Sequence, residues 1–228
     1  MHLFAIADTH LSFGTGKPMD IFPGWSEHIP RLEKNWNAVV SPDDTVVVAG
    51  DVSWAMSFEQ AIPDFAFLHA LNGQKIILKG NHDYWWSTRK KMEEFLSLNG
   101  FTSVNILHNN AIETCGVCVC GSRGWFFDAE DEADRKVLLR EAGRLDTSIS
   151  QAEKTGLEPV VFLHYPPADM NRVCPEIYGV LTAHKTKRCY YGHMHGRAAR
   201  GAFNGVRDGV RFTLISADYR DFTPLKIE

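Results

Sequence analysis

Five short apolar runs in this sequence each end in side chains that can bind a metal ion. The runs are rich in β-branched and aromatic residues, and their length of about 4–8 residues is typical of strands buried on both faces. They read LFAIADTH, TVVVAGD, KIILKGNHD, PVVFLHYPP and RCYYGHMH. The polar residues that follow the apolar parts are Asp8, His10, Asp51, Asn81, His82, Asp83, His164, His193 and His195. A chain with this pattern is expected to build sheets that have a polar edge.

Helical patterns alternate with these runs. The segments with apolar residues at helical spacing are residues 31–40, 65–71, 88–98 and 132–154. The second segment follows Pro63, which suits a first helical turn. Two further strands are expected at residues 116–120 and 211–216. Alternating strands and helices predict an α/β fold with at least partly parallel sheets, and the absence of a clear linker predicts one domain over residues 1–228.

The polar clusters are expected to meet in space, because ligands of open α/β sheets collect outside the carboxyl ends of the strands. Taken singly, each cluster has an ordinary explanation as a helix cap, a turn or a hydrogen-bonded core histidine. Together, two Asp, one Asn and four His form a ligand set that suits Mn, Fe or Zn. Seven side chains are too many for one tetrahedral zinc ion. The set therefore favours two metal ions that share a bridging carboxylate.

The composition narrows the class of protein. With 228 residues, of which 44% are hydrophobic and 23% charged, the chain is of the globular type. Its net charge of −4 is not the basic balance of a nucleic-acid binder, so nucleic acid is an unexpected partner. No run of about 18 apolar residues predicts a membrane span. Because a strand is expected from residue 2, we expect no signal peptide and a cytoplasmic location.

The order of the motifs D-x-H, G-D, G-N-H-D, H and G-H-x-H resembles the calcineurin-like metallophosphoesterase superfamily from Asp8 to His195. The resemblance implies a four-layer αββα sandwich, in which two mixed β-sheets pack face to face between flanking helices. The protein Ser/Thr phosphatases of this superfamily carry Asp-Arg-Gly shortly after G-D. Here the run is GDVSWAMS, which places the chain with the small prokaryote-like phosphohydrolases.

The resemblance also implies a role for each polar residue. The implied ligands of the first metal ion are Asp8, His10 and His195, and those of the second are Asn81, His164 and His193. Asp51 is implied to bridge both ions, since one carboxylate offers two oxygens. His82 is implied to be the active-site histidine near the leaving group, and Asp83 to hydrogen-bond and orient it.

The implied reaction is hydrolysis of a phosphomonoester or phosphodiester bond in a small phosphorylated substrate. Two cations about 3.5–4 Å apart clamp the phosphate and lower the pKa of a bound water, and the resulting hydroxide attacks. One alternative is a nuclease with the same metals, which the acidic net charge disfavours. Another is an inactive protein-binding scaffold, which is expected to lack ligands that are all present here. The pattern specifies no oligomeric state.

Several residues are candidates for selecting the substrate. Residues 11–25, LSFGTGKPMDIFPGW, lack periodicity and are expected to form a loop at the rim of the site. Arg123 is a candidate phosphate contact, and Arg89 lies beside the implied active-site histidine. Trp85 and Trp86 are candidate stacking platforms or, equally, core packing. A local basic excess lies around the last motif, at Lys185, Lys187, Arg188, Arg197 and Arg200. It is expected either to attract anionic substrates or to be an ordinary solvated surface.

His193 and His195 are two residues apart, a spacing that places side chains on one face of a regular strand. The resemblance instead assigns them to different metal ions. We therefore expect the backbone to leave strand geometry at about Gly192, because glycine is suited to such a change.

Overall fold

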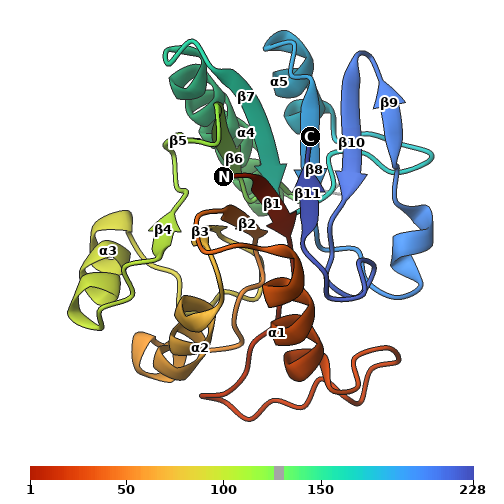
Figure 1. Cartoon of the computed structure of the whole chain (residues 1–228). Coiled ribbons are helices and arrows are strands. Elements are labelled where there is room, and N and C mark those ends of the chain that lie inside the picture. The colour runs from red at the N-terminus through yellow and green to blue at the C-terminus, as the bar shows by residue number, and fades with distance from the viewer. Residues whose placement is uncertain (126–130) are drawn as a thin grey trace.

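The computed structural model describes residues 1–125 and 131–228, which form two β-sheets (Figure 1). The first sheet has the strand order β11-β1-β2-β3-β4. Its strands are β1 (Leu3–Ile6), β2 (Thr45–Ala49), β3 (Gln74–Leu78), β4 (Val104–Ile106) and β11 (Leu225–Ile227). Strands β1 to β4 are parallel and β11 is antiparallel to β1, so the sheet is mixed.

The second sheet has the order β5-β6-β7-β8-β10-β9. Its strands are β5 (Ile112–Thr114), β6 (Val117–Ser122), β7 (Glu158–Leu163), β8 (Arg188–Tyr191), β9 (Gly205–Arg207) and β10 (Val210–Leu214). The four inner strands are parallel, and the edge strands β5 and β9 are antiparallel to their neighbours. In both sheets the parallel strands therefore end at a common edge.

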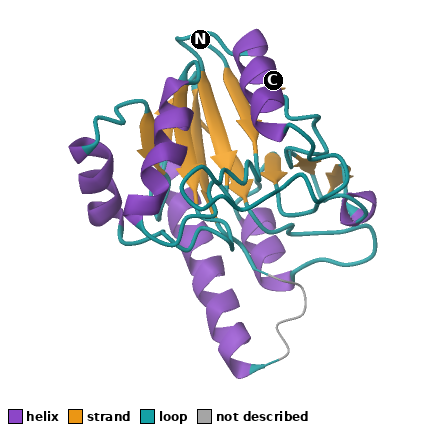
Figure 2. Ribbon diagram, turned by 90° about the horizontal axis from the view of Figure 1, so that it is seen from below, coloured by secondary structure: helices purple, strands orange, loops and turns teal. Residues whose placement is uncertain are grey.

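Helices cover the outer face of each sheet (Figures 1 and 2). The helices are α1 (His28–Val39), α2 (Phe58–Ala70), α3 (Arg89–Leu98), α4 (Glu132–Glu153), α5 (Pro175–Ala183) and the short 3-10 helix η1 (Ala198–Gly201). Helices α1 to α3 pack on the first sheet, and α4 and α5 on the second. No helix in the described part of the chain combines the length and the apolarity needed to cross a membrane.

Alternating side chains along the strands separate three hydrophobic cores. In β2, Val46 and Val48 pack with helices α1 to α3, whereas Val47 packs with the second sheet. In β7, Val161 packs with α4 and α5, whereas Phe162 faces the first sheet. Three cores between four layers confirm the predicted αββα sandwich. They also explain why these strands are apolar without alternation, since both faces of each strand are covered.

Helix α2 differs from the prediction that Pro63 lies near its start. The helix begins at Phe58, where the Ser57 side chain accepts a hydrogen bond from the Gln60 amide (3.4 Å), and Pro63 lies inside it. The buried face of the helix includes Ala61, Phe65 and Leu68. Packing of this face outweighs the interior hydrogen bond that proline cannot donate. Helix α5 and four edge strands are additional to the predicted elements. The strands have three residues each, which is too short to show a period.

Candidate metal centre

The five predicted polar clusters lie together at the carboxyl ends of β1, β2, β3, β7 and β8. Hydrogen bonds join these loops within each sheet, and a further contact joins the two sheets. The amide of Asp8 donates to the carbonyl of Gly50 (2.9 Å), and the amide of Gly192 donates to the carbonyl of His164 (3.1 Å). The side-chain Nδ1 of His164 lies 3.2 Å from the carbonyl of Ala49. The site is therefore built across the junction of both sheets.

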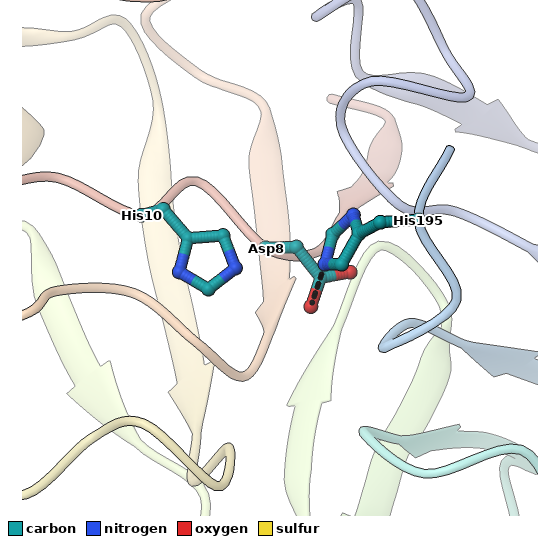
Figure 3. Close-up of side chains that lie close together, drawn as sticks. All are labelled: Asp8, His10 and His195. Atoms are coloured by element: carbon teal, nitrogen blue, oxygen red, sulfur yellow. Dashed lines mark ion pairs between the residues drawn. The ribbon is translucent and has the colours of Figure 1, made fainter. Parts of the chain in front are cut away.

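The first cluster consists of Asp8, His10 and His195, which converge from the loops after β1 and β8 (Figure 3). One ligand atom of each lies within 4.8 Å of the others. His195 Nε2 is 3.4 Å from Asp8 Oδ1. His10 Nδ1 and His195 Nε2 are buried and have no hydrogen-bond partner among the described residues. Orphaned imidazole nitrogens beside a buried carboxylate fit a transition-metal ion.

The second cluster consists of Asp51, His164 and His193, whose ligand atoms also lie within 4.8 Å of one another. Asn81 completes it, because its Oδ1 lies 2.6 Å from His164 Nε2 and 3.0 Å from His193 Nδ1. An amide oxygen and two imidazole nitrogens that meet at one point are donors of the kind that a cation requires.

Asp51 lies between the two clusters. Its Oδ2 is 3.5 Å from His164 Nε2 in the second cluster and 3.7 Å from His10 Nε2 in the first. Its Oδ1 accepts a hydrogen bond from the amide of His82 (2.7 Å). Burial, and then the negative charge of Asp8, raise the pKa of Asp51 to about 7. A cation at either cluster would offset both effects.

Most histidines of the site are kept neutral, the form in which histidine binds metals. Burial lowers the pKa of His193 to about 3, and it also lowers the pKa of His10 and of His164. His195 differs, because Asp8 and Asp218 outweigh the effect of burial and raise its pKa to about 10. Metal binding at the first cluster must therefore displace a proton from His195.

The backbone is strained at four of the predicted ligands. The φ angles are +62° at Asp8, +46° at His10, +49° at Asp51 and +70° at His193. Non-glycine residues rarely adopt this left-handed region, and such residues gather at functional sites where the surrounding structure holds them. The loops therefore hold these side chains at an energetic cost.

The last motif leaves strand geometry as expected, but for a different reason. Strand β8 ends at Tyr191, and the left-handed residue is His193 rather than Gly192. Gly192 is required instead by close approach, since a Cβ there would lie 2.5 Å from Ala7 Cβ and 2.7 Å from Asp8 Oδ2. The turn places His193 in the second cluster and His195 in the first.

Substitution of Gly192 by alanine should destabilise the fold by about 1–3 kcal/mol, the usual cost of an overpacked site. The same clash should displace Asp8 and reduce the metal content of the protein. Urea denaturation and elemental analysis would measure both effects. Gly179→Ala in α5 is the matched control, because its Cβ would meet no atom within 4 Å. Unchanged stability and metal content in Gly192→Ala would contradict this account.

His82 lies beside the metal clusters and is not part of them. Its ring centroid is 4.3 Å from that of Trp54, and its Nδ1 is 3.3 Å from the hydroxyl of Tyr84. Burial lowers its pKa to about 4. The side chain is half-buried and lines the cavity above the clusters.

Asp83 has a different role from the predicted one. Its carboxylate accepts hydrogen bonds from the amides of Val52 (2.9 Å), Ser53 (3.2 Å) and Gly80 (2.7 Å). It also accepts one from Trp85 Nε1 (3.2 Å). Among the described residues these are its hydrogen-bond donors, and the ring of His82 is not one of them. Asp83 therefore ties the loop after β3 to the loop after β2, and it positions Asn81 and Asp51 rather than His82.

Four of the candidate substrate contacts, Arg89, Arg123, Trp85 and Trp86, are not part of the lining of this cavity. Arg123 pairs with the buried Glu141 (3.4 Å), and Arg89 pairs with Glu93 on the same helix (2.6 Å). Trp85 is buried in the core of the first sheet, and Trp86 packs against its ring at 5.3 Å. Of the two predicted alternatives for these tryptophans, the structure shows core packing.

Asp218 is a residue of the site that sequence reasoning missed. Its Oδ1 lies 3.0 Å from His195 Nδ1, and its Oδ2 accepts a hydrogen bond from the amide of Gly196 (2.8 Å). It thereby directs His195 Nε2 toward Asp8. The sequence does contain a pattern that indicates Asp218. It closely follows the apolar run of β10 in LISAD, just as the predicted ligands follow the apolar runs of their own strands.

Replacing Asp218 by asparagine should lower the affinity of the first cluster for metal by about 10–100-fold, because a carboxylate on the second nitrogen fixes and strengthens a histidine ligand. Titration calorimetry with Mn²⁺ would measure the change. Asp221→Asn is the control, since Asp221 pairs with Arg31. Equal affinities of the two variants would exclude this role for Asp218.

The fold and the site together define a class of protein. A sandwich of two mixed sheets whose strand ends carry two adjacent clusters of Asp, Asn and His is built for metal-dependent chemistry. The sequence matches the calcineurin-like phosphoesterase family over residues 1–197, so the chain belongs to this family. Membership supports metal-dependent phosphoester hydrolysis. Asp218 lies beyond the matched residues.

Solved structures share this fold. TT1561 of Thermus thermophilus has a TM-score of 0.57 and 11% identity, with 100% of this chain and 98% of that chain covered. Phosphopantetheinyl hydrolase (PptH) from Mycobacterium tuberculosis has a TM-score of 0.54 and 16% identity, with coverages of 99% and 95%. The protein of unknown function AQ665 from Aquifex aeolicus has a TM-score of 0.52 and 18% identity, also with 99% and 95%. The comparison with curated protein sequences returned no match.

Proposed function

We propose that this protein is a phosphoesterase with a dinuclear metal centre that hydrolyses a small phosphorylated substrate. The observation that carries the proposal is the position of Asp51, whose Oδ2 lies within 3.7 Å of a histidine nitrogen in each cluster. One carboxylate oxygen that faces two sets of ligands is the arrangement expected of a bridge between two ions.

The donors present fit two divalent or trivalent ions such as Mn, Fe or Zn. The first ion would be held by Asp8, His10 and His195, the second by Asn81, His164 and His193, and both by Asp51. When bound, the ions would neutralise phosphate oxygens and activate the attacking water. The chain keeps three of its four histidine ligands neutral by burial, so that only His195 must lose a proton when the centre is loaded.

His82 acts on the substrate from the wall of the cavity. With its pKa near 4 the ring is neutral at pH 7 and offers one N–H donor to a phosphate or leaving-group oxygen. The negative charge of a bound phosphate favours the protonated ring. His82 is then able to donate a proton to the departing oxygen.

A panel of phosphoesters, run together with elemental analysis, tests this function. The purified chain should hydrolyse p-nitrophenyl phosphate or its bis ester with Mn²⁺, Fe²⁺ or Zn²⁺, and it should contain two ions. The relative rates on the two esters decide between monoesterase and diesterase. Folded protein that binds no metal, or that hydrolyses neither ester with any of these ions, would refute the proposal.

A further inference from the structure

A cavity of about 800 Å³ lies over the metal centre. Its lining includes His10, Asp51, His82, His193 and His195. Cavities of about 300–1,000 Å³ bury organic ligands of drug size. The space is therefore much larger than a phosphate group needs, and the organic part of the substrate has room beside the reacting phosphate.

One part of the cavity lining is apolar and comes from the rim loop predicted at residues 11–25. Met19, Phe22, Pro23 and Trp25 all line the cavity, and the side chain of Phe22 is 46% exposed. Apolar side chains that gather on the lining of a cavity are informative, because contiguous apolar surface on a soluble protein marks binding sites. This lining favours an apolar organic group.

The apolar lining is fixed to the metal centre. Trp25 is buried, and its ring centroid is 5.6 Å from those of His10 and His195. The indole N–H of Trp54 donates to Met19 Sδ (3.3 Å), and the Trp54 ring stacks on His10 at 4.9 Å. The loop thus holds its apolar side chains at a set position relative to the reacting phosphate.

Another part of the lining is cationic. Arg197 and Arg200 line the cavity at helix η1, directly after the last metal motif, and both are exposed. Neither forms an ion pair with a carboxylate within residues 1–125 and 131–228, whereas Arg123 and Arg144 share Glu141. Guanidinium groups bind carboxylates and phosphates in a bidentate manner. Two unpaired guanidinium groups in a substrate cavity favour a second anion on the substrate.

We infer that the preferred substrate is a phosphoester whose organic group is apolar and carries a second anionic group. The apolar part lies along Met19, Phe22 and Pro23, and Arg197 and Arg200 bind the second anion. The inference rests on the proposed phosphoesterase function and names its substrate class. The reaction remains hydrolysis, in which the oxygen of water bonds to phosphorus, the P–O bond to the organic group breaks, and the departing oxygen takes up a proton.

Matched aryl phosphates test the second anion. The probes are 3-(4-phosphonooxyphenyl)propanoate, its carboxyl methyl ester, which keeps the phosphate and lacks the second charge, and the same scaffold with a second phosphate in place of the carboxylate. For the Mn²⁺-loaded full chain, kcat/KM for an anionic probe should exceed that for the methyl ester at least about tenfold, the scale of one charge-assisted hydrogen bond. The difference should lie mainly in KM, and the better anionic probe identifies a carboxylate or a phosphate as the second group.

Variants then assign the preference to residues. In the double variant Arg197→Gln, Arg200→Gln the ratio of kcat/KM between the anionic probe and its ester should fall to about one. Arg140→Gln is the matched control, since Arg140 is an exposed arginine of α4 outside the cavity lining, and it should keep the wild-type ratio. Phe22→Ser should lower kcat/KM for the methyl ester at least about fivefold relative to that for glycerol 2-phosphate, because the serine removes apolar contact area.

The failures of the two proposals are distinguishable. Hydrolysis of p-nitrophenyl phosphate with a wild-type ratio near one, or with a ratio that the arginine variants leave unchanged, would overturn the substrate class alone. An unchanged relative rate in Phe22→Ser would overturn the apolar half of the inference. Lack of hydrolysis of any phosphoester by the metal-loaded protein would overturn the phosphoesterase function, and the substrate class with it.

Discussion

Replacing Asp51 by asparagine should remove most of the bound metal and abolish activity. Asp51 Oδ2 faces both ligand clusters, so the substitution takes a charged donor from both at once. Loss of a partner that only orients a ligand costs about 10–100-fold in affinity, so loss of the bridge should cost at least about 100-fold. Elemental analysis after gel filtration should find less than one ion per chain, against two in the wild type.

The same substitution should stabilise the metal-free protein at neutral and higher pH. Burial and the charge of Asp8 raise the pKa of Asp51 to about 7, above its ordinary value of 3.8. Between these two values the folded chain holds a proton that the unfolded chain has released, so stability falls as the pH rises toward 7. Asparagine does not titrate. In chelator, the wild type should therefore lose free energy of unfolding relative to Asp51→Asn between about pH 4 and 7.

Asp44 provides the matched control. It lies just before β2, as Asp51 lies just after it, and it is also buried, with the amides of His2 and Ser41 as donors. Asp44→Asn should lower stability and leave the metal content at two ions per chain. A wild-type metal content in Asp51→Asn, or a stability difference that does not change with pH, would show that Asp51 is not the bridging carboxylate described above.

His82→Ala should keep both metal ions and lose turnover. The hydrogen bond between His82 and the metal ligands is made by its backbone amide, which donates to Asp51 Oδ1 and survives the substitution. The lost imidazole is the proton donor to the leaving group, so kcat should fall by about 10²–10⁴-fold. Steady-state kinetics on p-nitrophenyl phosphate and elemental analysis of the same preparation would measure both quantities.

His108→Ala controls for the loss of an imidazole. His108 is also partly buried, with its pKa lowered to about 4 by burial, but it packs against Trp86 outside the cavity. This variant should change kcat much less than His82→Ala does. If His82→Ala loses metal instead of turnover, His82 is a ligand and the proposed role is wrong.

Much of the fold could be predicted, because local patterns report burial directly. The β2 and β7 segments are apolar at every interior position, which requires cover on both faces and hence a layered α/β fold. Helix α4 could also be predicted from the sequence, since its buried residues Leu138, Ala142 and Leu145 have helical spacing. The start of α2 could not be predicted from the sequence. Pro63 removes a hydrogen bond from the helix interior, and that loss is offset by packing that exists only in the folded chain.

The candidate site, like the fold, could be predicted only in part. Which residues are ligand candidates follows from the sequence, because parallel strands must deliver their carboxyl ends, and the polar residues there, to one edge. Which atoms meet is decided by tertiary structure. The contact of Asp218 with His195 and the contacts of Asp83 with the loop after β2 join residues more than 20 positions apart, and no local pattern encodes such pairs.

The sequence by itself thus determined the layers of the fold and the edge where chemistry-bearing side chains gather, since both follow from the period and the end of each apolar run. The family resemblance already divided those side chains between two clusters. Only the tertiary structure decided how the chain makes that division, through the left-handed turn at His193 and the close approach at Gly192. The tertiary structure alone also brought the apolar loop and Arg197 to the same cavity. The physical reason is that long-range packing sets backbone angles and distances that each short segment, on its own, leaves free.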